Sequence, residues 1–365
     1  MKIGLIDADL LDNGTKHPNL ALMKLSGYHK AKGDDVRLLL NYDEIELYEN
    51  VIISRVFTFT KVPDLSKYNN IRIGGTGFFP EDGGESLADE IEHHMPDYSL
   101  YDEYIELEVK KGKKESRFHD YKNYSIGFAT RGCFRKCSFC VNRKYNYVFK
   151  HSPIEEFLDV TKKGIYLWDD NFLGYPKWEE ILDELIQTGK RFQFRQGLDI
   201  RLMDEKKVLK FSKIKYLGDY IFAFDHIEDK EIISEKLKLW KKYIKKTTKL
   251  YVLCAYESQD IKDIEKVFER IQILMEHGAL PYIMRYEKYK NSDFKDMYIQ
   301  LARWCNQPRF FKKMSFREFC ELNQKFHKNR STFCSSYRTL INMEKEYPEL
   351  AKRYFDMKYE NLNRY

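Results

Sequence analysis

Three cysteines fall within eight residues of this chain, in the run Cys133-Phe-Arg-Lys-Cys137-Ser-Phe-Cys140. Thiolates on one short loop can bind three irons of a [4Fe–4S] cube and leave the fourth iron without a protein ligand. Zinc also binds cysteines at short spacing, but a closed structural zinc site needs four ligands. Such a site would have to be completed by a residue outside the run, such as His151 or Cys254. The spacing therefore favours the iron–sulfur cluster.

The chain has seven cysteines, and the four outside this run are scattered: Cys254, Cys305, Cys320 and Cys334. An odd number without regular spacing does not indicate a disulfide framework. The first residues, MKIGLIDADL, contain acidic side chains in place of a basic signal segment, and no apolar run approaches the ~20 residues that span a bilayer. We therefore expect a cytoplasmic protein without a membrane partner, whose thiols stay reduced and can bind metal.

The composition is that of a folded chain long enough for two domains, with 365 residues, 43% of them hydrophobic and 33% charged. Its 63 Lys and Arg residues against 57 Asp and Glu residues leave a net charge of +6. Spread over a large surface, this charge gives no case for binding long nucleic acid. The charge does not exclude small phosphate-bearing ligands.

The apolar pattern divides the chain into four segments. Residues 1–82 contain four short apolar or β-branched runs and one amphipathic stretch, which predicts a small Rossmann-like parallel α/β domain. Residues 83–124 mix aromatic and charged residues without clear periodicity and indicate a linker, with room for one hairpin. Residues 125–292 alternate six apolar runs with helical stretches, and residues 293–365 are rich in helical pattern.

The six alternating runs are YSIGFAT, GIYLWDD, RFQFRQGLD, YIFAFD, KLYVLCAY and LPYIMRYE. Strand and helix alternation of this kind predicts a parallel sheet with helices outside it. The sheet is either an open, doubly wound one or a partial (βα)6 barrel of the TIM type, and we expect the partial barrel. The cysteine run then stands at the carboxyl end of its first strand.

The cysteine run resembles the signature of the radical S-adenosylmethionine (SAM) superfamily, in which an aromatic residue precedes the third cysteine, as Phe139 does here. The resemblance covers about residues 125–290. It implies that SAM binds the open iron through its amino and carboxylate groups, with Phe139 near the adenine. One electron from the reduced cluster then cleaves SAM to a 5′-deoxyadenosyl radical. It also implies an electron donor such as flavodoxin or ferredoxin.

Polar residues after the later strands fit the same resemblance, because the carboxyl ends of parallel strands face the reaction chamber. Members of the superfamily bind the SAM amine after the second strand, where this chain has Asp169, Asp170 and Asn171 in place of the usual Gly-Gly-Glu. After the third strand, Arg201 is expected to pair with the SAM carboxylate and Gln196 or Asp199 to bind a ribose. Solvated salt bridges in a loop are the alternative for each. Four residues at later strand ends are candidates for substrate contact, with structural roles as the alternative: Asp225, His226, Tyr256 and Arg285.

Features of the amino-terminal segment count against two classes of radical SAM enzyme. His17 lacks the Asp-x-His-x-x-Gly surroundings of a cobalamin-binding loop, so we expect no cobalamin. The absence of cysteines before Cys133 excludes methylthiotransferases, which hold a second cluster there. Gly74-Gly75-Thr76-Gly77 is expected to be architectural and not a phosphate cradle.

As a whole, the order of PNLALMKLSGYHK, GGTGF, DYSLY, ATRGCFRKCSFC, LWDDNFLG and QGLDIRLM resembles a family of clostridial and gut-bacterial radical SAM proteins that includes the queuine lyases. This resemblance implies hydrogen abstraction from the ribose of queuosine 5′-phosphate and release of the base queuine. A small nucleoside or nucleotide is then the expected partner. Two other classes stay open: a radical enzyme that modifies RNA or another metabolite, and a non-catalytic metal-binding protein.

Overall fold

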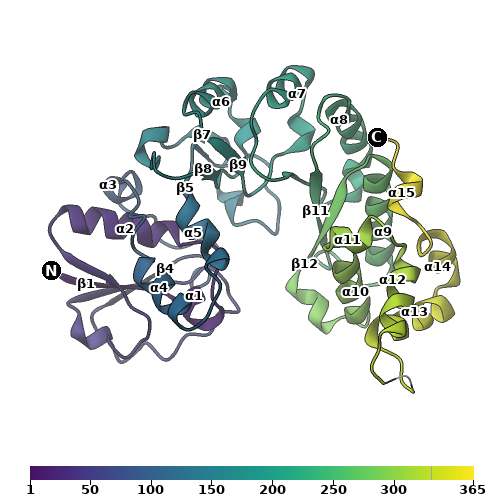
Figure 1. Ribbon diagram of the computed structural model, residues 1–365, viewed down its shortest axis with the longest axis horizontal. Helices are drawn as coiled ribbons and strands as arrows, with labels where there is room; N and C mark the ends of the chain where they lie inside the picture. The colour runs from purple at the N-terminus through teal and green to yellow at the C-terminus, as the bar shows by residue number, and fades with distance from the viewer. Residues whose placement is uncertain (330) are drawn as a thin grey trace. The chain divides into compact units, whose positions relative to one another are not determined.

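The computed structural model describes residues 1–329 and 331–365 and divides into two compact units, Met1–Gln196 and Gly197–Tyr365 (Figure 1). The division falls after the third of the six strands predicted for the barrel. The predicted domain boundaries stay predictions, and each unit is described by itself.

The first unit begins with a four-stranded parallel sheet in the order β2-β1-β3-β4. Its strands are β1 (Lys2–Asp7), β2 (Asp35–Leu38), β3 (Asn50–Ser54) and β4 (Ile71–Gly74). Five of the six residues of β1 are buried, as expected for a central strand covered on both faces. Helices α1 (Ala8–Asn13) and α2 (Leu20–Ala31) follow β1, each capped at its amino end by the side chain of Asp7 or Asn19. The predicted small α/β domain is confirmed as a parallel sheet.

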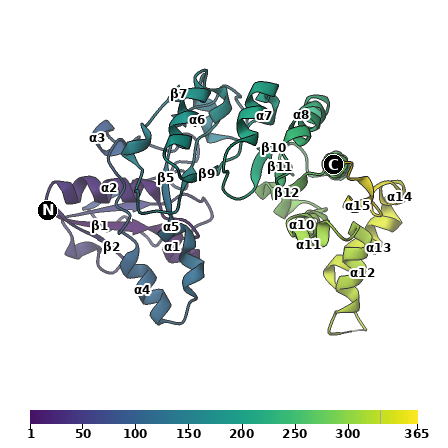
Figure 2. The same cartoon turned by 45° about the horizontal axis from the view of Figure 1, so that its top comes forward.

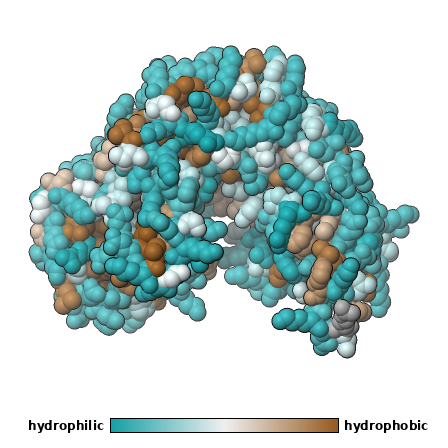
Figure 3. Space-filling view, viewed as in Figure 1, coloured by the Kyte–Doolittle hydropathy of each residue, from teal (hydrophilic) through white to brown (hydrophobic). Residues whose placement is uncertain are grey.

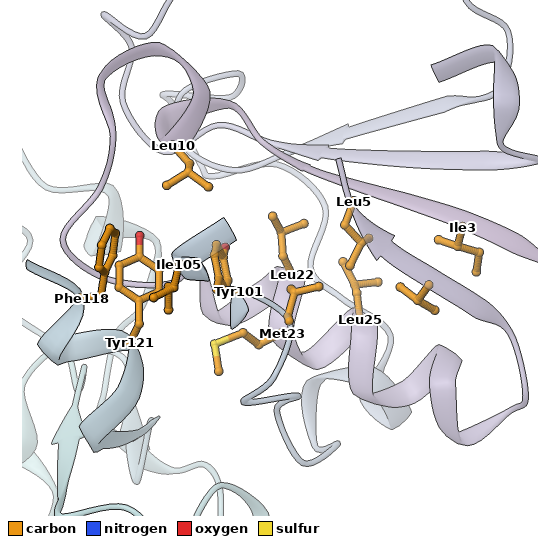
Figure 4. Packing of buried hydrophobic residues seen from close by; sticks show 12 residues of the cluster. Ile3, Leu5, Leu10, Leu22, Met23, Leu25, Tyr101, Ile105, Phe118 and Tyr121 are labelled. Carbon is orange, nitrogen blue, oxygen red and sulfur yellow. The ribbon is translucent and has the colours of Figure 1, made fainter. Parts of the chain in front are cut away.

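The segment predicted as a linker is helical, and the predicted hairpin is wrong. Helices α3 (Asp89–Glu92), α4 (Asp102–Lys110) and α5 (His119–Asn123) occupy residues 83–123, where the structure has no strand. The segment packs its apolar side chains against the first sheet and α2, and Figure 4 shows this cluster. From the segment it includes Leu100, Tyr101, Ile105, Phe118 and Tyr121. Burial of these widely spaced residues stabilises helices that show little local periodicity.

The second part of this unit is a three-stranded parallel sheet in the order β5-β8-β9. Strands β5 (Tyr124–Gly127), β8 (Gly164–Leu167) and β9 (Arg191–Phe194) are the first three runs predicted for the barrel. Helix α6 (Trp178–Gln187) connects β8 to β9 and buries Ile181, Leu182 and Leu185. A short antiparallel pair, β6 (Thr130–Arg131) and β7 (Phe149–Lys150), closes the loop that carries the three cysteines.

The second unit contains a three-stranded parallel sheet in the order β10-β11-β12. Its strands are β10 (Tyr220–Ala223), β11 (Thr248–Cys254) and β12 (Leu280–Arg285), the last three predicted runs. Helix α7 (Glu205–Ser212) precedes β10, α8 (Lys230–Tyr243) connects β10 to β11, and α9 (Ile261–Glu276) connects β11 to β12. The six predicted strands are therefore confirmed as parallel strands. They lie in two three-stranded sheets, one in each unit, and their closure into a partial barrel stays a prediction.

The predicted helical tail is confirmed. It consists of α10 (Lys295–Cys305), α11 (Pro308–Phe311), α12 (Phe316–Lys325), α13 (Ser335–Glu346), α14 (Pro348–Tyr354) and α15 (Tyr359–Leu362), which Figure 2 shows grouped together. Aromatic residues of the tail, including Trp304, Phe311 and Phe316, are buried and contact one another. They therefore form core.

The face of the molecule in Figure 3 is mostly hydrophilic, with small hydrophobic patches. No helix within residues 1–329 and 331–365 combines the length and the apolar character needed to cross a bilayer.

Candidate metal and cofactor site

The cysteine loop leaves the sheet after β5 and runs from Gly132 to a short 3₁₀ helix at Val141–Lys144. Gly132 has φ +91°, and a Cβ atom at this position would lie 2.3 Å from the carbonyl oxygen of Tyr147. Only glycine fits such a close approach without moving the backbone. The turn then tightens where the Cys140 amide donates to the Cys137 carbonyl at 3.0 Å. The three cysteines are partly buried on this loop.

The sulfurs of Cys133 and Cys140 accept hydrogen bonds. Cys133 Sγ accepts from the Arg135 amide and from Asn171 Nδ2, both at 3.4 Å. Cys140 Sγ accepts from the Asn142 amide at 3.4 Å. N–H groups directed at sulfur are the outer-shell contacts that cysteine ligands of iron–sulfur clusters use, because they stabilise thiolate charge. The loop therefore fits the ligand set of a cluster.

The individual thiolates of a cube bind different irons, whereas the ligands of a zinc ion converge on one point. In the part of the chain that the structure describes, no three His, Cys, Asp or Glu side chains are grouped to hold a single metal ion.

Asp169 lies two residues after the end of β8, is 1% exposed and binds the backbone that leads into the cysteine loop. Its carboxylate accepts from the amides of Ala129 and Thr130, at 3.2 and 2.6 Å, and from the Thr130 hydroxyl at 2.6 Å. Burial raises the pKa of Asp169 to about 7, and these three donors act in the opposite direction. The predicted role of Asp169 with the SAM amine stays a prediction, and the structure shows a carboxylate already bound by three donors.

Asp170 fixes both ends of the cysteine loop. Its carboxylate accepts from the Gly132 amide at 2.8 Å and from Asn142 Nδ2 at 2.7 Å, and it lies 3.3 Å from Arg131 Nε. Gly132 immediately precedes the first cysteine, and Asn142 stands two residues after the third. Sequence reasoning missed Asn142, because nothing in the sequence marks an asparagine after the motif as the partner of an aspartate 28 residues away.

Asn171 follows Asp169 and Asp170 and also contacts the cysteine loop. While its Nδ2 donates to Cys133, its Oδ1 is buried and has no hydrogen-bond partner within the described residues. A buried amide oxygen without a partner costs free energy unless a donor reaches it. This oxygen is therefore a buried acceptor beside the first cysteine sulfur that no described residue satisfies.

His17 joins the amino-terminal sheet domain to the second sheet of the same unit. Its Nδ1 lies 2.9 Å from Asp120 Oδ2, and its Nε2 lies 3.0 Å from Arg195 Nη2. The ring also meets Trp168, which directly precedes Asp169, edge to face at 5.8 Å. Both ring nitrogens therefore have protein neighbours, and the expectation that His17 does not bind cobalt stays a prediction. Gln196, after β9, is exposed.

In the second unit, the predicted carboxylate-binding residue Arg201 already has carboxylate partners. Its Nε lies 2.8 Å from Asp199 Oδ1, its Nη2 3.2 Å from Asp199 Oδ2, and its Nη1 2.7 Å from Asp229 Oδ2. This geometry is a salt bridge within a loop, which the sequence analysis gave as the alternative to binding the SAM carboxylate. The roles predicted for Arg201 with SAM and for Asp199 with a ribose stay predictions.

Three of the four predicted substrate residues line one small cavity of about 20 Å³ at the carboxyl ends of β10 and β11: Asp225, His226 and Tyr256. Burial raises the pKa of Asp225, which accepts one hydrogen bond, from the Leu253 amide at 3.3 Å. Arg270, a residue that sequence reasoning missed, lines the same cavity. Arg285 is exposed at the end of β12 and lies over the ring of Tyr289.

Comparison with known proteins places the fold. No protein-family model matches the sequence, and neither does any curated protein. A structure of the radical SAM methyltransferase TsrM from Kitasatospora setae, with its tryptophan substrate and the SAM analogue aza-SAM bound, matches with a TM-score of 0.51 and 12% identity. The match covers 77% of this chain and 72% of that one. The chain shares the fold of a radical SAM enzyme.

A second structure of TsrM from Kitasatospora setae, with cobalamin and a [4Fe–4S] cluster bound, matches with a TM-score of 0.49 and 12% identity. It covers 78% of this chain and 74% of that one. At 12% identity, the match with a TM-score of 0.51 concerns the α/β fold alone.

Proposed function

We propose that this protein is a radical SAM enzyme whose [4Fe–4S] cluster is held by Cys133, Cys137 and Cys140. The observation that carries the proposal is the cysteine loop itself, with N–H groups directed at two of its sulfurs, in a chain that shares the fold of a radical SAM methyltransferase. When bound, the cluster and SAM would supply one-electron cleavage of the sulfonium and a 5′-deoxyadenosyl radical that abstracts hydrogen from the substrate.

Within this proposal, Asn171 is the residue best placed to hold the amino group of SAM. Its buried Oδ1 needs a donor, and its Nδ2 is fixed by the sulfur of Cys133, so the oxygen is held in one orientation. Asp169 and Asp170 position the loop through the backbone of residues 129–132. The aromatic ring of Phe139, one residue before the third cysteine, is assigned to the adenine by the resemblance of the motif.

For the substrate we propose a nucleotide, and specifically queuosine 5′-phosphate, cleaved to release queuine. The support is the order of sequence segments that resembles the queuine lyases. Removal of a ribose hydrogen would leave a sugar radical in which the C–N glycosidic bond breaks. In the second unit, the partly buried carboxylate of Asp225 in its cavity with His226 and Tyr256 would bind an amine or a guanine-like edge of the base.

Anaerobic reconstitution tests the cluster and the SAM chemistry. The reconstituted protein should contain about four irons and four sulfides per chain and form 5′-deoxyadenosine from SAM when reduced with dithionite. Cys137→Ala should abolish both properties. Cys334→Ala, which removes a partly buried cysteine outside the loop, is the matched control and should keep both. Zinc binding without SAM cleavage would leave a non-catalytic metal-binding protein.

A separate incubation tests the substrate. Reduced holoenzyme with SAM and queuosine 5′-phosphate should release free queuine, measured by mass spectrometry. If SAM is cleaved but no base is released, and another metabolite is consumed in its place, the lyase proposal ends while the radical SAM proposal stands.

A further inference from the structure

Two ranges of the second unit contain many lysines and no acidic residue. Residues 206–218 contain five lysines and residues 236–256 contain seven, and neither range has an Asp or Glu. Of the 63 Lys and Arg residues, 51 lie elsewhere in the chain together with all 57 Asp and Glu residues, so the remainder has a net charge of −6. The expectation that long nucleic acid is not a partner rested on a charge spread over the whole surface, whereas the chain concentrates it in these two ranges.

The structure brings the two ranges together at one edge of a sheet. Helices α7 and α8 lie side by side, as Figures 1 and 2 show, and the Tyr243 hydroxyl donates to Glu205 at 2.6 Å. Each helix is followed by a short loop, residues 213–219 or 244–247, that leads into the amino end of β10 or β11. The two strands pair in parallel from their first residues, so both loops lie at the amino-terminal edge of the sheet.

Two side-chain contacts join the loops before β10 and β11. Lys246 Nζ donates to the Tyr216 carbonyl at 2.6 Å. Lys249, the second residue of β11, pairs with Asp219, the residue before β10, at 2.6 Å. The carboxylate of Asp219 neutralises Lys249, whereas a carbonyl orients an ammonium group without cancelling its charge. Lysines of both ranges therefore meet at this edge.

The start of β12 continues the same edge. Lys241 Nζ donates to the carbonyl of Gly278, two residues before β12, at 2.8 Å, and the Lys241 carbonyl accepts from Lys245 Nζ at 3.2 Å. Burial, followed by the charges of Lys245 and Lys312, lowers the pKa of Lys241 to about 8. Lys245 and Lys312 are exposed. Three ammonium groups therefore lie close together here, and a bound anion would offset their mutual repulsion.

We define the basic edge as the lysines gathered at this end of the sheet: Lys213, Lys215, Lys241, Lys245, Lys246 and Lys312. Lys213 and Lys215 are exposed in the loop before β10. In residues 213–219 and 244–249, all of which the structure describes, no large hydrophobic side chain is exposed. The basic edge therefore presents charge without an apolar centre.

Helix stability alone does not account for this charge. The negative end of the α8 dipole favours cations in the last turn of the helix, where Lys241 and Lys242 lie. The effect falls off within that turn, and Lys215 and Lys245 lie outside the helices. Their charges are available to a partner outside the chain.

We propose that the basic edge binds the phosphate backbone of a folded RNA. Lysines bind phosphates as point charges, and such contacts hold a nucleic acid without reading its bases. An acidic protein is the other macromolecule that the charge could attract, but a protein interface needs an apolar or aromatic centre, which the basic edge does not present.

The position of the basic edge indicates that the RNA is held and not modified there. The cavity with Asp225, His226 and Tyr256 lies at the opposite, carboxyl ends of β10 and β11. A strand of the length of β11 separates the two edges by about 20 Å. RNA binding is therefore a property beyond the proposed function, and it does not depend on the identity of the small substrate.

The test compares Lys213→Glu/Lys245→Glu with Lys290→Glu/Lys295→Glu. The control makes the same change of charge at two exposed lysines that follow the carboxyl end of β12 in the same unit. Fluorescence anisotropy of a labelled, unmodified tRNA transcript measures the affinity of the full-length protein. At an ionic strength of about 0.1 M, the first variant should bind on the order of tenfold more weakly than the wild type, and the control should bind like the wild type. Both variants should keep the wild-type melting temperature, and added salt should weaken binding by the wild type.

Equal affinity of the two double variants for the transcript would overturn the proposal, as would the absence of salt-dependent binding by the wild type. Binding of phosphatidylglycerol vesicles in place of RNA would also overturn it and would assign the basic edge to an anionic membrane surface. After incubation of reconstituted holoenzyme with SAM, dithionite and the transcript, the nucleoside masses should be unchanged, and a modified nucleoside would contradict holding without modification. Both variants should cleave SAM with dithionite at the wild-type rate, so a wild type that cleaves no SAM but binds RNA would overturn the proposed function alone.

Discussion

Asn171 donates its side-chain N–H to the sulfur of Cys133 at 3.4 Å, across 38 residues of sequence. This contact joins the residue after β8 to the first residue of the cysteine motif. Asp169 and Asp170 bind the backbone just before the motif, so three consecutive residues after β8 hold the loop in place. These contacts explain how the sulfurs can keep fixed positions on a loop that is partly exposed.

Asn171→Asp should shift the midpoint potential of the bound cluster to a more negative value. The substitution keeps the shape of the side chain but replaces an N–H donor near a thiolate by a carboxylate, which disfavours the added electron. Loss of one hydrogen bond of about 1 kcal/mol corresponds to about 40 mV for a one-electron couple. Potentiometric titration followed by electron paramagnetic resonance measures the shift.

Asn146→Asp, at an exposed position of the same segment, is the control for the added charge. Its midpoint potential should stay closer to that of the wild type. Equal shifts in both variants would show that charge in the segment acts on the cluster and that the contact with Cys133 does not.

Gly132→Ala should prevent assembly of the cluster. Gly132 has φ +91°, and its added methyl group would lie 2.3 Å from the Tyr147 carbonyl, so the loop must move. Gly112→Ala is a close control, because Gly112 has φ +92° and no heavy atom within 4 Å of the added carbon. The control should lose about 1 kcal/mol of stability from backbone strain alone. Iron content after reconstitution and the melting temperature distinguish the two, and normal iron content in Gly132→Ala would contradict this role of the glycine.

The sequence was sufficient for the strands, because they rest on local pattern, and the same kind of pattern singled out the three cysteines that we propose as ligands. Runs such as YIFAFD are short and apolar, and the three cysteines are adjacent. The sequence was insufficient to predict helix α4, because contact with the first sheet decides which of its residues, such as Ile105, are buried. The amide of Asn171 was assigned to the cofactor from its place after a strand, but its contact with Cys133 depends on how β5 and β8 pair. Contacts between distant segments, such as Asp170 with Asn142, have no signature in a single sequence.

Asp169 should make the stability of the protein depend on pH between about 4 and 7. Burial raises its pKa to about 7 in the folded state, whereas an unfolded aspartate titrates near 3.9. The stabilising contribution of the protonated carboxyl is complete below about pH 4 and is lost as the pH rises through 7. The free energy of unfolding of the wild type relative to Asp169→Asn should therefore fall by roughly 2–4 kcal/mol over this range. Denaturant unfolding of the cluster-free protein measures it.

For Asp34→Asn in the same unit, we expect the stability difference from the wild type to depend on pH in the opposite direction. A hydrogen bond from the amino terminus, and then one from His29, lowers the pKa of Asp34. Its stabilising contribution is present above the pKa of an unfolded aspartate and is lost only as the pH falls toward the folded value.

The account given for Asp169 would be contradicted if the difference in unfolding free energy between the wild type and Asp169→Asn stayed constant from pH 4 to 8.

Arg270→Met should destabilise the second unit strongly. Arg270 is 2% exposed, and its Nη1 donates to the carbonyls of Phe224, Asp225 and Leu253 at 2.7 to 3.0 Å, which ties the ends of β10 and β11 together. Methionine fills much of the same volume but leaves buried carbonyls without donors, at a cost of about 1–3 kcal/mol for each group that water does not reach. Arg353→Met, at an exposed residue that pairs with Glu265, should change stability by less than about 1 kcal/mol. Calorimetric melting of both variants tests the difference, and similar melting temperatures would show that the carbonyls at the cavity of Asp225 find other partners.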